Sequence, residues 1–197
     1  MHRRVEGKRI AFLATDGVEQ VELTDPWTAV REAGADPKLI SIESGRIQAV
    51  HGMDKADTFL VDDTVEQASP AKFDALVIPG GVASPDKMRM DPRAVAFVRA
   101  FFEPGKPAGV ICHGPWMLVE ADIVRGRTLT SYPSLKTDIR NAGGIWVDEE
   151  VHVEHGLVTS RRPRDLPAFC GKIVEAFAAG IHPEQVILTD HAAGGFA

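Results

Sequence analysis

The sequence predicts an α/β protein in which a mostly parallel sheet is covered by helices on both faces. Short uninterrupted apolar runs recur along the chain, amphipathic stretches alternate with them, and turns rich in glycine and proline end many of them. Continuous apolar runs are typical of strands buried on both faces, and their alternation with helices is typical of parallel βαβ units. The 197 residues, 44% of them apolar, suffice for one domain whose core needs no disulfide or metal.

The apolar runs place the strands. The first run ends at Thr15-Asp16-Gly17, and the run over residues 75–78 is broken by Pro79-Gly80-Gly81. Turn glycines at both ends of residues 45–52 predict part of a hairpin at the edge of the fold. We expect the other strands over residues 9–14, 39–42, 75–78, 107–111, 145–153 and 157–160.

The amphipathic stretches place the helices. Asp91-Pro92 combines a capping residue with a first-turn proline and so predicts a helix start. We expect helices over residues 21–33, 92–102, 115–121, 135–141 and 165–179. Residues 8–179 then form the core of a single domain spanning 1–197. Residues 180–197 form a C-terminal extension that packs on this body or on a partner.

Composition and charge exclude several classes of protein. A net charge of −6 argues against a nucleic-acid binder, which needs a concentrated basic face. No apolar run reaches the roughly 18 residues of a membrane span, and the first eight residues lack the apolar stretch of a secretory signal. Two cysteines without zinc-like spacing favour a reducing compartment. We therefore expect a cytoplasmic protein without metal or cofactor that contacts neither membrane nor nucleic acid.

Cys112 is the strongest candidate for chemistry. It follows the strand over 107–111 and precedes the helix over 115–121, at the sheet edge where open parallel sheets bind ligands. The free N–H groups and dipole of a helix N-terminus favour thiolate, His113 is adjacent, and Gly114 permits a tight turn. Free cysteines are also among the most buried residues, so a buried filler is the alternative. The local pattern leaves both interpretations open.

Two other turns end at the same edge of the expected sheet. Glu19 follows the first strand, and a protonated Glu19 would donate a hydrogen bond to the cysteine sulfur. An acidic first helical turn shared with Glu22 is the alternative, and without three-dimensional evidence it is favoured. Gly80-Gly81 offers backbone N–H groups to an oxyanion, although glycine pairs also occur simply as turns.

Several further motifs accompany these residues in a fixed order along most of the chain. They are Glu19-Gln20-Val21-Glu22-Leu23, Gly80-Gly81, Val110-Ile111-Cys112-His113-Gly114-Pro115, Arg127-Thr128-Leu129-Thr130-Ser131-Tyr132-Pro133, Asn141-Ala142-Gly143-Gly144 and Trp146-Val147-Asp148. Together, from about Lys8 to Phe177, they resemble the PfpI/ThiJ superfamily, specifically its PfpI-like branch of cysteine hydrolases and stress proteins. The resemblance favours the reactive interpretation of Cys112.

The resemblance implies a flavodoxin-like three-layer α/β/α sandwich with a nucleophile-elbow cysteine. By position, it implies that Cys112 is the nucleophile, that His113 is paired with it and that Glu19 is the acidic residue in contact with it. Backbone groups of Gly80, Gly81 and His113 would serve an oxyanion. Asp86 matches an acidic residue that approaches the site from a neighbouring subunit, which implies a homodimer or a higher homo-oligomer.

The implied function is a stress-defence enzyme acting on small reactive carbonyls or glycated amines, of glyoxalase, deglycase or hydrolase type. Cys112 adds to an electrophilic carbon, and His113 and Glu19 move protons. The alternatives are a redox sensor whose Cys112 is oxidised by peroxide, a residual cysteine peptidase, and a holdase that needs no chemistry. Cys170, among apolar residues of the last helix, is expected in the core, where it would not resolve an oxidised Cys112.

One basic run remains outside this scheme. Arg161-Arg162-Pro163-Arg164 follows the strand over 157–160 and is expected at the rim of the sheet. A solvated, helix-capping basic turn is the favoured interpretation, because most charged residues lie on the surface. A contact with a neighbouring subunit or with an anionic substrate is the alternative.

Overall fold

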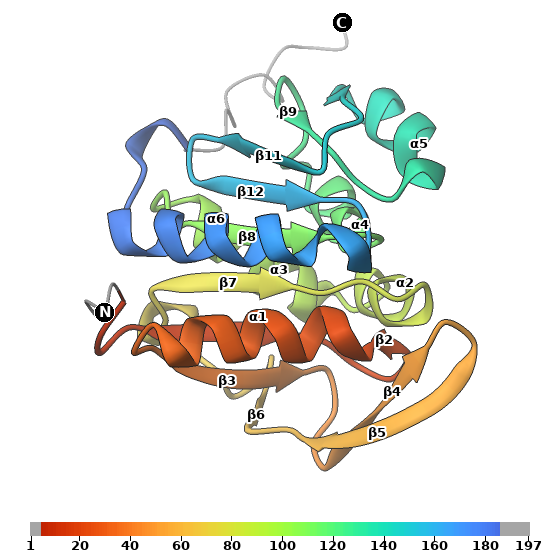
Figure 1. Cartoon of the computed structure of the whole chain (residues 1–197), viewed down its shortest axis with the longest axis vertical. Helices are drawn as coiled ribbons and strands as arrows, with labels where there is room; N and C mark the ends of the chain where they lie inside the picture. Colours follow the sequence, from red (N-terminus) through yellow and green to blue (C-terminus); the bar gives the residue numbers. More distant parts are fainter. Residues whose placement is uncertain (1–4, 186–197) are drawn as a thin grey trace, which may run out of the picture.

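A seven-stranded sheet forms the centre of the computed structural model, which describes residues 5–185 (Figure 1). Its strand order is β11-β12-β8-β7-β1-β3-β6, and only the edge strand β11 runs antiparallel to its neighbour. The strands of the chain are β1 (Arg9–Leu13), β2 (Val18–Glu19), β3 (Asp36–Ser41), β4 (Arg46–His51), β5 (Asp54–Leu60), β6 (Asp63–Thr64), β7 (Ala75–Ile78), β8 (Ala108–Ile111), β9 (Thr128–Leu129), β10 (Ile145–Trp146), β11 (Val151–Glu154) and β12 (Leu157–Ser160).

Helices cover the sheet on both faces, as the sequence predicts. They are α1 (Gln20–Glu32), α2 (Ala83–Arg89), α3 (Pro92–Phe102), α4 (Pro115–Glu120), α5 (Lys136–Asn141) and α6 (Leu166–Ala179). Figure 1 shows α1 and α6 on the near face, and α3 and α4 behind the sheet. Asp91 caps α3 by accepting a hydrogen bond from the Arg93 N–H, as its position before Pro92 predicts.

Each face of the sheet has its own apolar core. On the near face, Phe12 of β1 packs against Trp27 of α1, with ring centres 5.0 Å apart. On the far face, Phe97 and Phe101 of α3 pack against the sheet beside Phe73. Central strands β7 and β8 are buried throughout, which explains their continuous apolar sequence. The fold prediction of an α/β sandwich with a mostly parallel sheet is confirmed.

One predicted strand differs from the structure, and two of its elements were not predicted. The strand expected over 145–153 is split, because β10 pairs with β9 whereas β11 turns to pair with β12. The second half of the hairpin, β5, carries mostly polar, exposed residues and gives no apolar signal in the sequence. Helix α2 is short, contains Pro85 in its first turn and lacks an amphipathic repeat, so the sequence does not mark it.

The described part of the C-terminal extension, residues 180–185, packs on the edge of the sheet opposite to Cys112. The His182 N–H donates to the Gly105 carbonyl at 2.8 Å, and the His182 ring lies against Gly156 in the turn before β12. Gly105 and Gly156 precede β8 and β12, whereas Cys112 follows β8. This segment therefore packs on the body, as expected, and does not shade the candidate site. Residues 186–197 lie outside the described part of the chain.

Packing between α6 and β8 gives a test of this arrangement. A Cβ at Gly109 would lie 2.5 Å from Ile173 Cγ2 and 3.1 Å from Phe169 Cζ, so Gly109→Ala overpacks the core. We expect it to lower the free energy of unfolding by about 1–3 kcal/mol in urea titrations. The control is Gly171→Ala on α6, where a Cβ meets nothing within 4 Å. It should raise stability by roughly 0.5–1 kcal/mol, and equal effects of the two substitutions would contradict this packing.

Candidate active site

Cys112 lies at a strained turn between β8 and α4. Its backbone φ is 62°, in the left-handed region that side chains other than glycine rarely adopt. Neighbouring segments hold the turn, since the Cys112 N–H donates to the Ser160 carbonyl at 3.0 Å and the Tyr132 N–H donates to the Cys112 carbonyl at 2.8 Å. Strain held in place by surrounding structure is typical of functional sites. The thiol itself is buried, with the residue 6% exposed.

His113 is positioned to take the thiol proton. Its Nδ1 lies 3.2 Å from Cys112 Sγ, and its Nε2 lies 3.3 Å from Ser134 Oγ. The ring stacks on Tyr132, with centres 4.6 Å apart. Burial lowers the pKa of His113, so the imidazole is neutral at neutral pH. A neutral ring that donates from Nε2 to Ser134 leaves Nδ1 free to accept the proton.

The acidic residue next to the cysteine is Glu22, three residues beyond the predicted Glu19. The Glu22 carboxyl is fully buried, and one of its oxygens accepts the Gly80 N–H at 2.8 Å. Its other oxygen has no hydrogen-bond partner among the described residues, and the carboxyl lies near enough to Cys112 to raise the pKa of the thiol. The Glu19 carboxylate instead accepts the Gly52 N–H at 2.9 Å and lies 3.6 Å from His51 Nδ1. Glu19 ends β2, which pairs with β4, so its side chain is directed to the β4–β5 hairpin rather than to the sulfur.

A signal for Glu22 was present in the sequence. Glu22, Pro26 and Val30 are spaced by four residues, and all three are buried along one face of α1. A carboxyl on the apolar stripe of a helix has to face the protein interior. Ser134 and Tyr132 were also missed as partners of His113, because they lie in a separate loop about twenty residues further along the chain.

Burial is the largest influence on the pKa values of Glu22 and Cys112. It raises the pKa of Glu22 to about 8, so this carboxyl is protonated at neutral pH and is able to donate a hydrogen bond to sulfur. Burial also raises the pKa of the Cys112 thiol, a negative charge on Glu22 raises it further, and the N–H groups of Gly81 and His113 lower it. The prediction that the N-terminus of α4 keeps Cys112 as a thiolate is therefore wrong, because the His113 N–H lowers the thiol pKa but burial raises it by more.

The two glycines after β7 differ in what they offer. The Gly80 N–H is occupied by the Glu22 carboxyl, whereas the N–H groups of Gly81 and His113 lower the pKa of the Cys112 thiol. A Cβ at Gly80 would lie 2.5 Å from Glu22 Oε2 and 2.6 Å from Cys112 Cβ, so only glycine fits between them. Gly80 therefore holds the carboxyl, and of the predicted oxyanion donors Gly81 and His113 remain as candidates beside the sulfur.

Asp86 is exposed on α2. The prediction that it reaches His113 of a neighbouring subunit concerns a second copy of the chain and stays a prediction.

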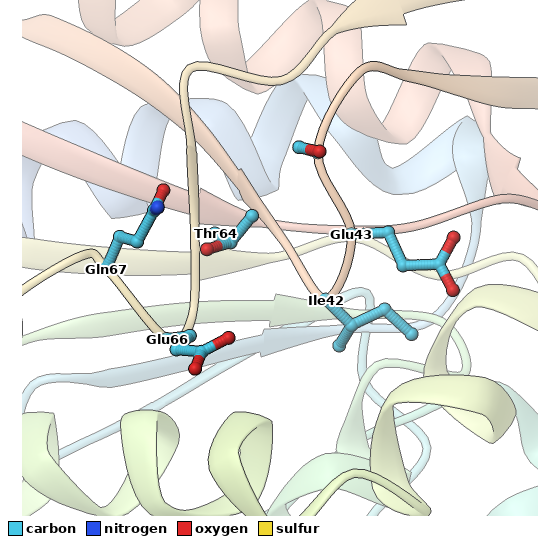
Figure 2. A pocket seen from close by; sticks show the side chains of 6 residues that line it. Ile42, Glu43, Thr64, Glu66 and Gln67 are labelled. Carbon is cyan, nitrogen blue, oxygen red and sulfur yellow. The ribbon is translucent and has the colours of Figure 1, made fainter.

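Two concave surfaces lie elsewhere on the described chain. One, of about 460 Å³, is lined by Ile42, Glu43, Ser44, Thr64, Glu66 and Gln67 at the ends of β3 and β6. Figure 2 shows that Glu43 and Glu66 reach it from two different segments, and Glu66 is paired with Arg93 at 3.2 Å. The other, of about 380 Å³, is apolar and lies beside Trp27 and Phe59. Neither lining includes a cysteine or histidine, so the candidate active site is the one around Cys112.

Two further classes of site were sought within residues 5–185. His, Cys, Asp and Glu side chains form no group of three or more there that could hold a metal ion. None of the helices in this range has the length and apolar composition of a membrane span.

The buried carboxyl makes stability depend on pH in a defined direction. Because the pKa of Glu22 rises from 4.5 to about 8 on folding, the folded chain keeps a proton that the unfolded chain loses. Its contribution to stability is full below pH 4.5 and is lost as the pH rises to about 8. We expect the free energy of unfolding to fall over this window by on the order of 2–4 kcal/mol relative to Glu22→Gln.

Chemical unfolding at pH 5, 6, 7 and 8 measures this difference. Glu32→Gln, at an exposed position on the same helix, is the control and should parallel the parent protein at every pH. Parallel profiles of the parent and Glu22→Gln would show that the carboxyl is not protonated in the folded state.

Comparison with known proteins finds a family match and similar relatives over most of the chain. Residues 8–176 match the DJ-1/PfpI family. The chain is 45% identical over 163 residues to protein/nucleic acid deglycase 2 of Escherichia coli, covering 82% of this chain and 93% of the relative. It is 42% identical over 167 residues to deglycase PH1704 of Pyrococcus horikoshii, covering 85% of this chain and 98% of the relative.

A solved structure extends the comparison. A two-domain protein of Anabaena variabilis, with DJ-1/ThiJ/PfpI-like and ferritin-like domains, superposes with a TM-score of 0.81 at 35% identity. The match covers 85% of this chain and 47% of that one, so this chain spans about half of the two-domain protein. Because one family description spans most of the chain and relatives above 40% identity match it nearly end to end, the chain belongs to the DJ-1/PfpI family.

Proposed function

We propose that this protein is a cysteine-dependent deglycase that removes α-oxoaldehyde adducts from amines. The observation that carries the proposal is the placement of one thiol between a neutral imidazole at 3.2 Å and a buried carboxyl with a raised pKa. One group accepts the thiol proton and the other stabilises the resulting negative charge on sulfur. The names of the relatives from Escherichia coli and Pyrococcus horikoshii support the same class of reaction.

The first step exchanges the amine for the enzyme thiol. His113 Nδ1 takes the proton from Cys112, and sulfur forms a bond to the carbinol carbon of the adduct. The carbon–nitrogen bond breaks, and the amine leaves with the proton that His113 received. The product is the free amine and a hemithioacetal on Cys112. For free methylglyoxal, the thiol adds across the aldehyde and gives the same hemithioacetal.

The remaining steps are an internal redox rearrangement and a hydrolysis. The hydrogen on the sulfur-bound carbon moves as a proton to the adjacent ketone carbon through an enediol, so the first carbon is oxidised to a thioester and the second is reduced to an alcohol. Protonated Glu22 and the N–H groups of Gly81 and His113 face the charge that develops beside sulfur. Water then cleaves the thioester, which releases lactate and restores the thiol.

The sequence prediction that this protein contacts no nucleic acid is not supported for its substrates. Net charge argues against tight, general binding to phosphates, but reaction at an exocyclic amine of a base needs no basic face. The relative in Escherichia coli is named a protein/nucleic acid deglycase. We therefore include nucleobase amines with protein amines in the proposed substrate class.

Substitution of the two cysteines tests the proposal. Cys112→Ser should reduce lactate formation from a methylglyoxal adduct of Nα-acetyllysine by on the order of a thousandfold or more, because a hydroxyl lacks the nucleophilicity of the thiol. Cys170→Ser is the matched control, since Cys170 lies on α6 and burial raises its pKa to about 12. Lactate release that survives in Cys112→Ser would overturn the proposal.

A second measurement separates adduct cleavage from removal of free aldehyde. Lactate is followed with the adduct as substrate, with and without a scavenger of free methylglyoxal. A deglycase should continue in the presence of the scavenger, faster than the adduct dissociates by itself. If lactate forms no faster than spontaneous dissociation, the enzyme is a glyoxalase and the deglycase proposal fails.

The peroxide-sensing and peptidase functions stay predictions. The same variant distinguishes the first of them from an enzyme, because a sensor without Cys112 loses its response to peroxide and has no turnover to lose.

A further inference from the structure

The three arginines that follow β12 have different surroundings. Arg161 donates to Asp165 at 2.8 and 3.2 Å and to Asp148 at 2.6 Å, and Arg164 lies 3.7 Å from Asp165. Two carboxylates are thus shared by two of the three cations. Arg164 is exposed, as expected of a solvated basic turn, whereas the Arg161 side chain is mostly buried in its ion pairs.

Arg162 is the cation that remains. Within residues 5–185 it forms no ion pair, and its Nε is buried without a hydrogen-bond partner. Asp148 lies close enough for its pKa to be lowered slightly by Arg162, but its hydrogen bond goes to Arg161. Of the nitrogens of this side chain, only Nε is among the described buried atoms without a partner, so the terminal Nη groups are the donors open to a ligand.

The backbone places Arg162 beside the nucleophile. Ser160, two residues earlier, accepts the Cys112 N–H at 3.0 Å, because β12 is the parallel neighbour of β8. The Arg162 guanidinium carbon lies 6.0 Å from the centre of the Tyr132 ring, and that ring stacks on His113. The Arg162 guanidinium and the Cys112 thiol therefore lie at the same edge of the sheet. Tyr132 contacts both Arg162 and His113, the neighbour of Cys112.

We propose that Arg162 is a specificity residue that recognises an oxyanion, a carboxylate or a phosphate, on the substrate that carries the adduct. The planar guanidinium offers paired N–H donors that match either group, and it keeps its charge at every physiological pH. This deepens the proposed function and rests on it: the preferred adducts are those of amines that also bear an acid group, such as amino acids and nucleotides.

Alkylating reagents test this recognition without requiring turnover. The probes are N-iodoacetylglycine, which carries a carboxylate, N-iodoacetylphosphoethanolamine, which carries a phosphate, and neutral N-iodoacetylglycinamide. Rates at Cys112 are resolved from those at Cys170 by peptide mass spectrometry. We expect at least one anionic probe to react about tenfold faster than the neutral one, the size of a partly exposed charge-assisted hydrogen bond. The two anionic arms show which acid group fits.

The variants assign that ratio to Arg162. Arg162→Gln should bring the anionic-to-neutral ratio close to one, Arg162→Lys should keep part of it, and Arg164→Gln, which removes an exposed neighbouring charge, should leave it unchanged. The inference is overturned if the parent shows no preference. It is also overturned if Arg162→Gln slows all probes by one factor, or if Arg164→Gln lowers the ratio equally.

Failure of this inference is distinguishable from failure of the proposed function. Equal probe rates together with Cys112-dependent lactate formation from adducts would remove Arg162 as a specificity residue and leave the deglycase intact. A preference for anionic probes without lactate formation would overturn the deglycase proposal and leave Arg162 as an anion-binding residue. A thiol that reacts with none of the probes in the folded protein would overturn both.

Discussion

The turn at Cys112 is the constraint on which the candidate site depends. A left-handed backbone at a residue with a side chain is held because hydrogen bonds reach it from two segments, at Ser160, the last residue of β12, and at Tyr132 in the loop after β9. The same bonds bring these segments to the sulfur. The central position of β8 in the sheet makes this possible, because β7 and β12 flank it and both end at the same edge. Preorganisation of the site is thus a consequence of strand order.

A second constraint is the single buried carboxyl. Glu22 is carried into the site by α1, whose position is set by apolar packing of Trp27 on Phe12. Burial that would be unfavourable for an ionised carboxylate is tolerated because the pKa rises and the Gly80 N–H binds one oxygen. The result is a proton donor next to sulfur at neutral pH. The proposed chemistry therefore depends on an acid that is kept neutral more than on a thiol that is kept charged.

In the proposed mechanism, chemistry and substrate recognition lie on different segments. The reacting groups come from the β8–α4 turn and from α1, whereas Arg162 belongs to the loop after β12. Parallel pairing of β8 with β12 places this loop beside the thiol without making it part of the turn. Substitution in such a loop changes which molecules are held near Cys112 and leaves the strained turn in place. The same fold is then able to act on adducts that are attached to different molecules.

The sequence by itself determined the layers of the fold and the place of Cys112 at the turn between a strand and a helix. Continuous apolar runs mark buried strands, and Cys112-His113-Gly114 stands between a strand and a helix, so both follow from local pattern. Which carboxyl contacts the sulfur was decided by the tertiary structure. Glu19 and Glu22 are three residues apart, and only the pairing of β2 with β4 turns the first away while the buried face of α1 turns the second inward. The charge state of the thiol was decided there as well, because desolvation depends on what surrounds a group in space and not on its neighbours along the chain.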